Sequence, residues 1–161
     1  MSDAAAPLVL QASAVAIDGR GLLIEGDPGS GKSSLALALI DGGAQLIGDD
    51  AVTLQAEGGL LMASPPPNIA GLLEVRGVGL IRLPLAPPTP VALILTLGGP
   101  LPERLPGPLP MRNLAGVAVP VLAFDPGTIA PAARARAALN LHGLPLKGAS
   151  LSGATAQDTA P

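Results

Sequence analysis

Apolar residues occur along the chain in short runs separated by glycine- and proline-rich segments, a pattern that predicts several β-strands and few helices. Residues 8–17 alternate apolar and small polar side chains with a period of about two, which predicts a strand. After a short turn, residues 22–24 would pair back as the second arm of a hairpin. The run that follows Lys32 predicts a helix that Gly42-Gly43 would end.

The rest of the chain continues this pattern as far as a final helix. Strands are predicted at 45–48, 51–54, 60–63, 91–96 and 117–122, an extended segment at 72–81, a proline-rich loop at 98–110, and a helix at 128–139 that Thr128 would cap. Pro120 indicates that its strand lies at a sheet edge. We therefore expect one α/β domain over 1–147, followed by a disordered tail at 148–161.

Composition narrows the class of partner. Hydrophobic residues make up 48% of the 161 residues and aromatic residues 1%, so the core is aliphatic and bases find no aromatic platform. The formal net charge of −3 provides no basic patch, and we expect no nucleic-acid partner. The absence of cysteine excludes disulfides and thiolate metal sites. Neither a signal peptide nor an apolar run of about 18 residues is found, and we expect a cytoplasmic protein without membrane contact.

One stretch has both the residue types and the spacing that a specific chemistry needs. It is the glycine-rich run Gly26-Asp27-Pro28-Gly29-Ser30-Gly31-Lys32-Ser33. The run fits the pattern G-x-x-x-x-G-K-[ST], in which backbone N–H groups surround nucleotide phosphates, the lysine reaches the outer phosphates and the hydroxyl binds Mg²⁺. A predicted strand precedes the run and a predicted helix follows it, which would aim the positive end of the helix at the phosphates. The alternative is a glycine-rich turn that carries Lys32 by chance.

Two acidic residues follow the predicted strand at 45–48. In a strand–helix–strand unit with a phosphate loop, the tip of the second strand lies near the bound nucleotide, so Asp49 and Asp50 are candidates for holding Mg²⁺ or activating a nucleophile. Because successive residues of an extended chain point to opposite faces, we expect only one of the two to face the terminal phosphate. The alternative is a pair of solvated carboxylates in a turn.

The segment at 72–81 contains a second charged pair. If this segment is extended, Glu74 and Arg76 share one face of it. Gly77 and Gly79 indicate a close approach of the backbone, which favours a functional site over a surface ion pair worth ~0–1 kcal/mol.

Three runs together resemble the catalytic domain of HPr kinase/phosphorylase. They are residues 26–33, 43–50 and 73–79, the last of which reads Leu-Glu-Val-Arg-Gly-Val-Gly. The resemblance covers roughly residues 11–139. In this the chain is similar to the short proteobacterial forms of the family. It implies a P-loop-bearing mixed α/β domain similar to phosphoenolpyruvate carboxykinase, usually assembled as a hexamer. The implied activity is ATP-dependent phosphorylation of a serine on the phosphocarrier protein HPr and, in many members, removal of that phosphate by inorganic phosphate.

The resemblance also implies a nucleotide site and a metal site. Residues 26–33 would bind ATP. Ser33 and Glu74 would be ligands of Mg²⁺, and Asp50 of the acidic pair after the strand at 45–48 is the third candidate ligand.

Four residues would carry the transfer step by the same resemblance. Asp49 would take the proton of the substrate serine, and Arg76 would belong to the signature site. Lys32 and Arg104 would neutralise the migrating phosphoryl group, and an arginine in that role can be worth ~10³–10⁵ in rate.

Two departures from the family pattern bear on the activity. Gln11 stands where the family has a histidine, and glutamine forms hydrogen bonds but cannot shuttle a proton. Residues 119–125 lack the basic Gly-Arg associated with dephosphorylation, which favours a kinase over a phosphorylase. The alternatives are a nucleotide-binding regulatory module that has lost turnover, and a small-molecule kinase. For the latter, only Arg104 and Arg112 could form the usual arginine-rich lid.

Overall fold

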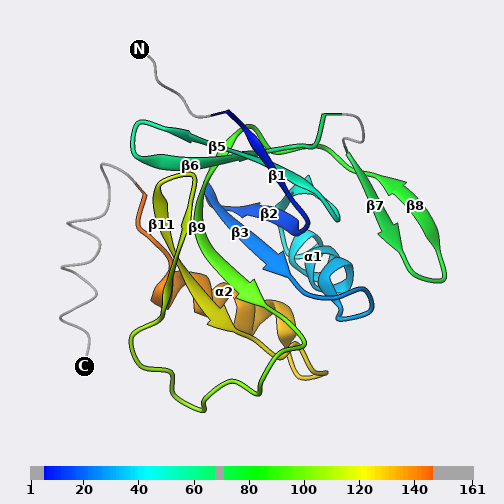
Figure 1. Cartoon of the computed structure of the whole chain (residues 1–161). Helices are drawn as coiled ribbons and strands as arrows, with labels where there is room; N and C mark the ends of the chain where they lie inside the picture. Colours follow the sequence, from blue (N-terminus) through cyan, green and yellow to red (C-terminus); the bar gives the residue numbers. More distant parts are fainter. Residues whose placement is uncertain (1–5, 68–70, 147–161) are drawn as a thin grey trace.

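The computed structural model describes residues 6–67 and 71–146, which form a curled sheet with two helices against it (Figure 1). The strands of the first half are β1 (Leu8–Leu10), β2 (Ser13–Ile17), β3 (Arg20–Glu25), β4 (Gln45–Gly48), β5 (Val52–Glu57) and β6 (Leu60–Ser64). Those of the second half are β7 (Leu72–Val75), β8 (Gly79–Arg82), β9 (Thr89–Thr96), β10 (Met111–Leu114) and β11 (Val117–Ala123). The helices are α1 (Lys32–Asp41) and α2 (Pro131–His142).

The described strands form one sheet of nine strands and one separate hairpin. The large sheet has the order β1-β5-β6-β9-β3-β2-β4, and β11 pairs with both β9 and β10. Its central strand, β9, is antiparallel to β6 and parallel to β3 and β11. The sheet is therefore mixed, as the family resemblance implied. The β7–β8 hairpin forms a sheet of its own and projects from the body at the right of Figure 1.

The core lies on both faces of the central strands. Leu22 and Ile24 of β3 face a cluster that contains residues of both helices, whereas Leu23 faces a second cluster with residues of β5 and β6. Strands buried on both faces read as continuous apolar runs, which is why residues 22–24 and 91–95 do not alternate. In the described part of the chain, neither helix is long and apolar enough to cross a membrane.

A crossover through α1 brings two loops to one edge of the sheet. β2 lies between β3 and β4 and is antiparallel to both, so β3 and β4 run in the same direction. Their carboxyl ends therefore lie at the same edge, where residues 26–31 leave β3 and residues 49–51 leave β4. This is the edge at which open α/β sheets bind their ligands.

The predicted strand at 8–17 is two strands in the structure. β2 pairs with β3 in the predicted hairpin, but β1 pairs with β5, with Val9 opposite Thr53. The chain changes partners at Gln11 and Ala12, which belong to neither strand. Local periodicity continues across this break and therefore could not reveal it.

Two further boundaries differ from the prediction because of backbone geometry. The segment 72–81 turns back on itself at 76–78, so it is a hairpin rather than one extended run. Helix α2 begins at Pro131 instead of Thr128, since Ala130 adopts a left-handed conformation with φ of 47° and Pro131 takes the first helical position.

The region around Pro120 is also more extensively paired than predicted. β10 was not expected from the sequence, and it pairs with the first half of β11. The second half of β11 pairs with β9, so β11 is not a simple edge strand. Pro120 lies just before the strand changes partner. The predicted tail at 148–161 lies outside the described residues.

Candidate functional site

The loop between β3 and α1 leaves the first N–H groups of the helix open to a ligand. Gly31 caps α1 in a left-handed conformation with φ of 103°, and no side chain caps the helix. The first N–H groups of a helix have no intrahelical acceptor, and together with the helix dipole they attract anions. Gly26 allows the loop to fold tightly, because a Cβ there would lie 2.3 Å from Ser30 Oγ and 3.1 Å from the carbonyl oxygen of Leu97.

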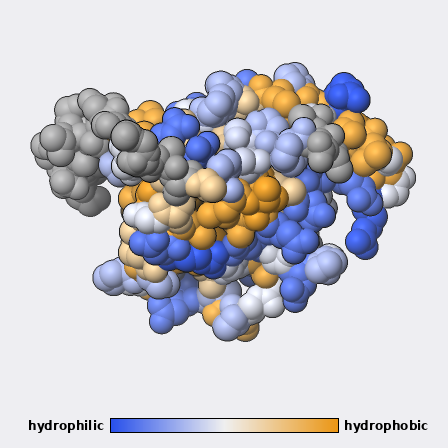
Figure 2. Space-filling view, turned by 45° about the horizontal axis from the view of Figure 1, so that its top comes forward, coloured by the Kyte–Doolittle hydropathy of each residue, from blue (hydrophilic) through white to orange (hydrophobic). Residues whose placement is uncertain are grey.

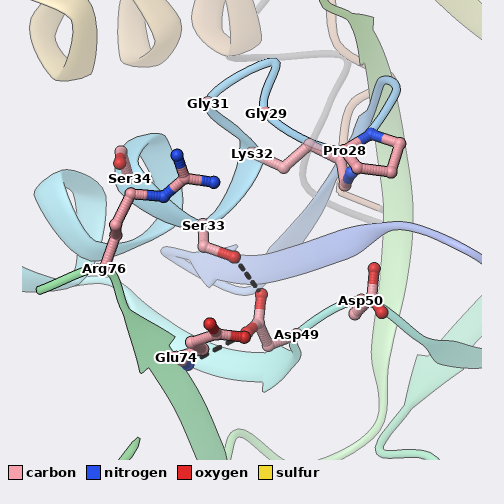
Figure 3. Close-up of a pocket in the computed structure, with 10 residues that line it drawn as sticks. All are labelled: Pro28, Gly29, Gly31, Lys32, Ser33, Ser34, Asp49, Asp50, Glu74 and Arg76. Atoms are coloured by element: carbon pink, nitrogen blue, oxygen red, sulfur yellow. Dashed lines mark hydrogen bonds between the residues drawn. The ribbon is translucent and has the colours of Figure 1, made fainter. Parts of the chain in front are cut away.

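A cavity of about 410 Å³ opens at this helix terminus (Figure 3). Three segments that are separate in the sequence line it: the loop and first turn of α1, the bend after β4, and the β7–β8 hairpin. The lining residues are Pro28, Gly29, Gly31, Lys32, Ser33, Ser34, Asp49, Asp50, Glu74 and Arg76. The wall therefore combines a lysine, an arginine, two hydroxyls and three carboxylates.

Asp49 is the residue that connects these segments. Its Oδ1 accepts hydrogen bonds from Ser33 Oγ at 2.6 Å and from Ser13 Oγ at 2.9 Å. Its Oδ2 accepts a hydrogen bond of 3.1 Å from the backbone N–H of Glu74. One carboxylate thus joins α1, β2 and β7 at the wall of the cavity.

Ser13, which is fully buried on β2, was not predicted as a site residue. All five residues of this strand are buried, and Ser13 is its only polar member. The one hint in the sequence was a single hydroxyl side chain within an otherwise apolar strand. It could not be interpreted without the partner, which lies 36 residues further along the chain.

Both acidic residues after β4 line the cavity, and the expectation that only one of them faces the terminal phosphate stays a prediction. That expectation assumed an extended backbone. Asp50 instead has a left-handed φ of 69°, so the alternation of a strand does not apply at this bend.

Glu74 and Arg76 also reach the same cavity from the hairpin. In Figure 3, Glu74 lies beside Asp49, and the Arg76 guanidinium extends toward Ser34. Within residues 6–67 and 71–146 the one ion pair joins Arg112 to Glu25, so Glu74 and Arg76 do not form the surface pair considered as the alternative.

The ammonium of Lys32 is held by the loop itself. Its Nζ donates to the carbonyl oxygen of Gly26 at 2.7 Å and, more weakly, to that of Asp27 at 3.4 Å. A lysine in this position is close to any anion bound at the helix terminus, and its ammonium has three N–H donors, of which these two carbonyls take two.

Arg104 lies apart from this group. It lines a second cavity, of about 690 Å³, between the loop at 97–110 and α2. Lys32 and Asp49, which were predicted to act with Arg104 in the transfer step, line the first cavity. Arg112, the other arginine considered for a lid, is in β10, with its Nη1 at 2.7 Å from both carboxylate oxygens of Glu25.

The oxygens around Asp49 offer a partial cation site. Among the residues that the structure describes, no group of three or more histidine, aspartate or glutamate side chains is close enough to hold a metal ion. Mg²⁺ often binds through one or two carboxylates together with substrate phosphates and water. The serine and carboxylate oxygens of this cavity fit that kind of site.

The part of the chain that carries the cavity matches a known family. The family model described as HPr Serine kinase C-terminal domain matches residues 3–85. HPr kinase/phosphorylase from Clostridium botulinum (strain Eklund 17B / Type B) is 49% identical over 67 residues, and its namesake from Brevibacillus brevis is 50% identical over 68. Each match covers 42% of this chain, and the chain spans 22% of the length of these relatives.

A solved structure extends the likeness to most of the chain. The Hpr(Ser) kinase/phosphatase from Coxiella burnetii superposes with a TM-score of 0.73 and 30% sequence identity. The match covers 83% of this chain and 95% of that one. The curled mixed sheet is therefore the fold of that protein.

Proposed function

The chain belongs to the HPr serine kinase C-terminal domain family, and we propose on this basis that it transfers a phosphoryl group from ATP to a serine of an HPr-like phosphocarrier protein. The observation that most supports the proposal is the hydrogen bond that Ser33, at the end of the glycine-rich loop, donates to the Asp49 carboxylate. A carboxylate, a hydroxyl and a helix N-terminus in one cavity are among the groups that phosphoryl transfer uses.

In this proposal residues 26–33 are a phosphate loop in a fold similar to phosphoenolpyruvate carboxykinase. The open N–H groups at the start of α1 would hold the phosphates, which needs no side chain. Lys32 would exchange the carbonyl of Gly26 for a phosphate oxygen. Gly29 and Gly31 give the loop a shape that other residues disfavour, since both adopt left-handed conformations, with φ of 87° and 103°.

We further propose that Ser33, Asp50 and Glu74 hold Mg²⁺ together with the phosphates. Ser33 donates a hydrogen bond to Asp49, so the lone pairs of its oxygen remain available to a cation. Asp50 and Glu74 contribute carboxylates from the bend and from the hairpin. A magnesium ion bound there would neutralise charge on the transferring phosphoryl group.

Asp49 and Arg76 would act on the reacting groups. Asp49 would orient the substrate hydroxyl and take its proton, and the Arg76 guanidinium would approach the phosphoryl group from the hairpin. The predicted role of Arg104 remains a proposal that requires movement of the loop at 97–110, because this residue lines the second cavity.

We also propose a homo-oligomer, hexameric by family resemblance. Apolar side chains exposed at two places support association: Val78 and Leu80 on the hairpin, and Leu101 and Leu105 on the long loop. Figure 2 shows apolar surface on the projecting arm at the right of the molecule, where the hairpin lies. Sedimentation velocity of the purified chain tests this, and a monomer at micromolar concentration would contradict it.

A direct assay tests the kinase. The protein is mixed with Mg²⁺-ATP and a phosphocarrier protein, and the carrier is weighed by mass spectrometry. We expect the mass of one added phosphate, located on a serine and absent when Asp49→Asn replaces the wild type. Wild type that binds ATP but adds no phosphate would overturn the kinase proposal.

A second function is favoured by Gln11, which is exposed and does not line the cavity. A nucleotide-binding regulatory module would keep the loop but lack turnover. The same assay separates the two, because the regulatory module binds nucleotide without any transfer to protein. Reverse transfer to inorganic phosphate is measured by incubating the phosphorylated carrier with the protein and phosphate.

A further inference from the structure

Ser13 is an unusual residue for its surroundings. In the described ranges the buried polar side chains are Ser13, which is fully buried, and Thr89, which is 3% exposed. The Thr89 hydroxyl donates a hydrogen bond to the carbonyl oxygen of Pro87, two residues away. Ser13 instead directs its hydroxyl to Asp49, at the wall of the cavity. A buried hydroxyl whose partner is a carboxylate in the candidate site calls for a role beyond the packing of β2.

The hydrogen bonds of Asp49 are unevenly distributed between its oxygens. A carboxylate oxygen has two lone pairs, and Oδ1 receives two hydroxyl donors, from Ser13 and Ser33. Oδ2 receives one donor, the N–H of Glu74. The acceptor site that remains is therefore on Oδ2.

We propose that Ser13 is a positioning residue for the phosphoryl transfer, which fills Oδ1 of Asp49 and leaves Oδ2 to receive the substrate proton. The inference rests on the proposed kinase function. Without Ser13, Oδ1 would have a free lone pair, and the carboxylate could turn about its Cβ–Cγ bond to present either oxygen. Ser13 restricts the carboxylate to one orientation, and it does so from a buried strand whose own position is fixed.

The step this assigns is balanced. The carrier serine hydroxyl gives its proton to Oδ2, and its oxygen forms a bond to the γ-phosphorus of ATP. The bond between that phosphorus and the bridging β–γ oxygen breaks, and ADP leaves with the electron pair. The proton on Asp49 then passes to water. Ser13 and Ser33 keep their own protons throughout, because both only donate hydrogen bonds.

The test uses variants that separate the hydroxyl from its volume. Ser13→Ala removes the hydroxyl, while Ser13→Thr and Ser13→Val have nearly the same size and differ in the hydroxyl alone. Thr89→Val removes the other buried hydroxyl and serves as the control. For each variant, kcat and KM for phosphate transfer to the carrier are measured, together with the affinity for a non-hydrolysable ATP analogue.

We expect Ser13→Ala to lower kcat about tenfold, the order expected for a hydrogen bond to a charged group, with KM for ATP and analogue affinity within about twofold. Ser13→Thr should recover most of the activity that Ser13→Val lacks, and Thr89→Val should match the wild type. If Ser13→Ala keeps the wild-type kcat, or if Ser13→Thr and Ser13→Val behave alike while both fold, the proposal is wrong.

Crystal structures of the wild type and of Ser13→Ala give a readout that needs no activity. We expect the Asp49 carboxylate to turn or to occupy two conformations in Ser13→Ala. An unchanged carboxylate, still bonded to Ser33 in one conformation, would overturn the role of Ser13 whatever the activity. Wild type that transfers no phosphate would overturn the kinase proposal alone, and the orientation of Asp49 would then decide the inference about Ser13.

Discussion

The ammonium of Lys32 donates a hydrogen bond of 2.7 Å to the carbonyl oxygen of Gly26, six residues earlier in the same loop. The loop therefore satisfies its own lysine before any ligand arrives. A phosphate that competes with this carbonyl for Lys32 carries a negative charge, so it adds a Coulomb attraction to the ammonium that the neutral carbonyl lacks. The contact also preorganises the lysine close to the helix terminus.

Removal of this lysine should separate binding from folding. We expect Lys32→Ala to weaken ATP binding by at least about 100-fold, while the free energy of unfolding changes by about 1 kcal/mol or less, because the bonds lost are partly exposed. Isothermal titration calorimetry and denaturant unfolding measure the two quantities. Arg82→Ala, which removes the same charge from an exposed position outside the cavity, is the control for net charge. Unfolded Lys32→Ala would contradict the expectation.

Ser33 should contribute to ATP affinity through the proposed Mg²⁺ ion, which its oxygen would bind while Asp49 accepts its hydrogen bond. We expect Ser33→Ala to bind ATP in EDTA as the wild type does, but to lose most of the gain in affinity that Mg²⁺ gives. The reason is that its oxygen is the proposed metal ligand held by Asp49. Titrations with and without Mg²⁺ measure this difference. Thr53→Val loses a hydroxyl bound to the carbonyl of Pro65, away from the cavity, and should keep the wild-type gain. An intact Mg²⁺ effect in Ser33→Ala would count against the metal site.

Gly48 shapes the bend that presents Asp49. A Cβ at this position would lie 2.3 Å from the carbonyl oxygen of Ala51, and backbone atoms cannot move aside at low cost. We expect Gly48→Ala to lower the free energy of unfolding by about 1–3 kcal/mol, as overpacking does. Gly99→Ala, at a position with no atom within 4 Å of the added Cβ, should change it little. Thermal unfolding of both variants checks the contrast, and equal stabilities would show that the bend adapts.

The ion pair between Arg112 and Glu25 should stabilise the link between β10 and β3. Its side chains are 37% and 18% exposed, so the pair is partly screened by water. A double-mutant cycle with Arg112→Met and Glu25→Gln should give a coupling energy of about 1 kcal/mol that falls at high salt. A coupling energy of zero at low salt would mean that the ion pair adds nothing to the free energy of unfolding.

The features of the site that follow from neighbouring residues could be predicted from the sequence. The loop at 26–31 and the end of α1 at Asp41 are examples, because glycine positions determine both. The hairpin of β5 and β6 was likewise predicted, since its turn at Gly58-Gly59 has the required composition. The family resemblance was confirmed by the comparisons, whereas the residue roles stay predictions.

What the sequence could not provide are the contacts between distant segments. Three such contacts are the pairing of β1 with β5, the Ser13–Asp49 hydrogen bond and the Arg112–Glu25 ion pair. The two side-chain contacts join residues 36 and 87 positions apart, and no local pattern specifies which strand pairs with β1. The left-handed φ of Asp50 was missed for a different reason. Aspartate tolerates that conformation without requiring it, so its presence alone is no signal.

The β7–β8 hairpin carries Glu74 and Arg76 to the cavity, yet it shares no strand ladder with the large sheet. It is anchored by Leu73, which is fully buried, and it touches Asp49 through a single backbone N–H. A unit fastened in this way opens at lower free energy than the sheet does. On warming, the cavity should therefore lose Glu74 and Arg76 from its wall before the protein denatures, and the proposed kinase activity should decline while the circular dichroism of the sheet is still intact.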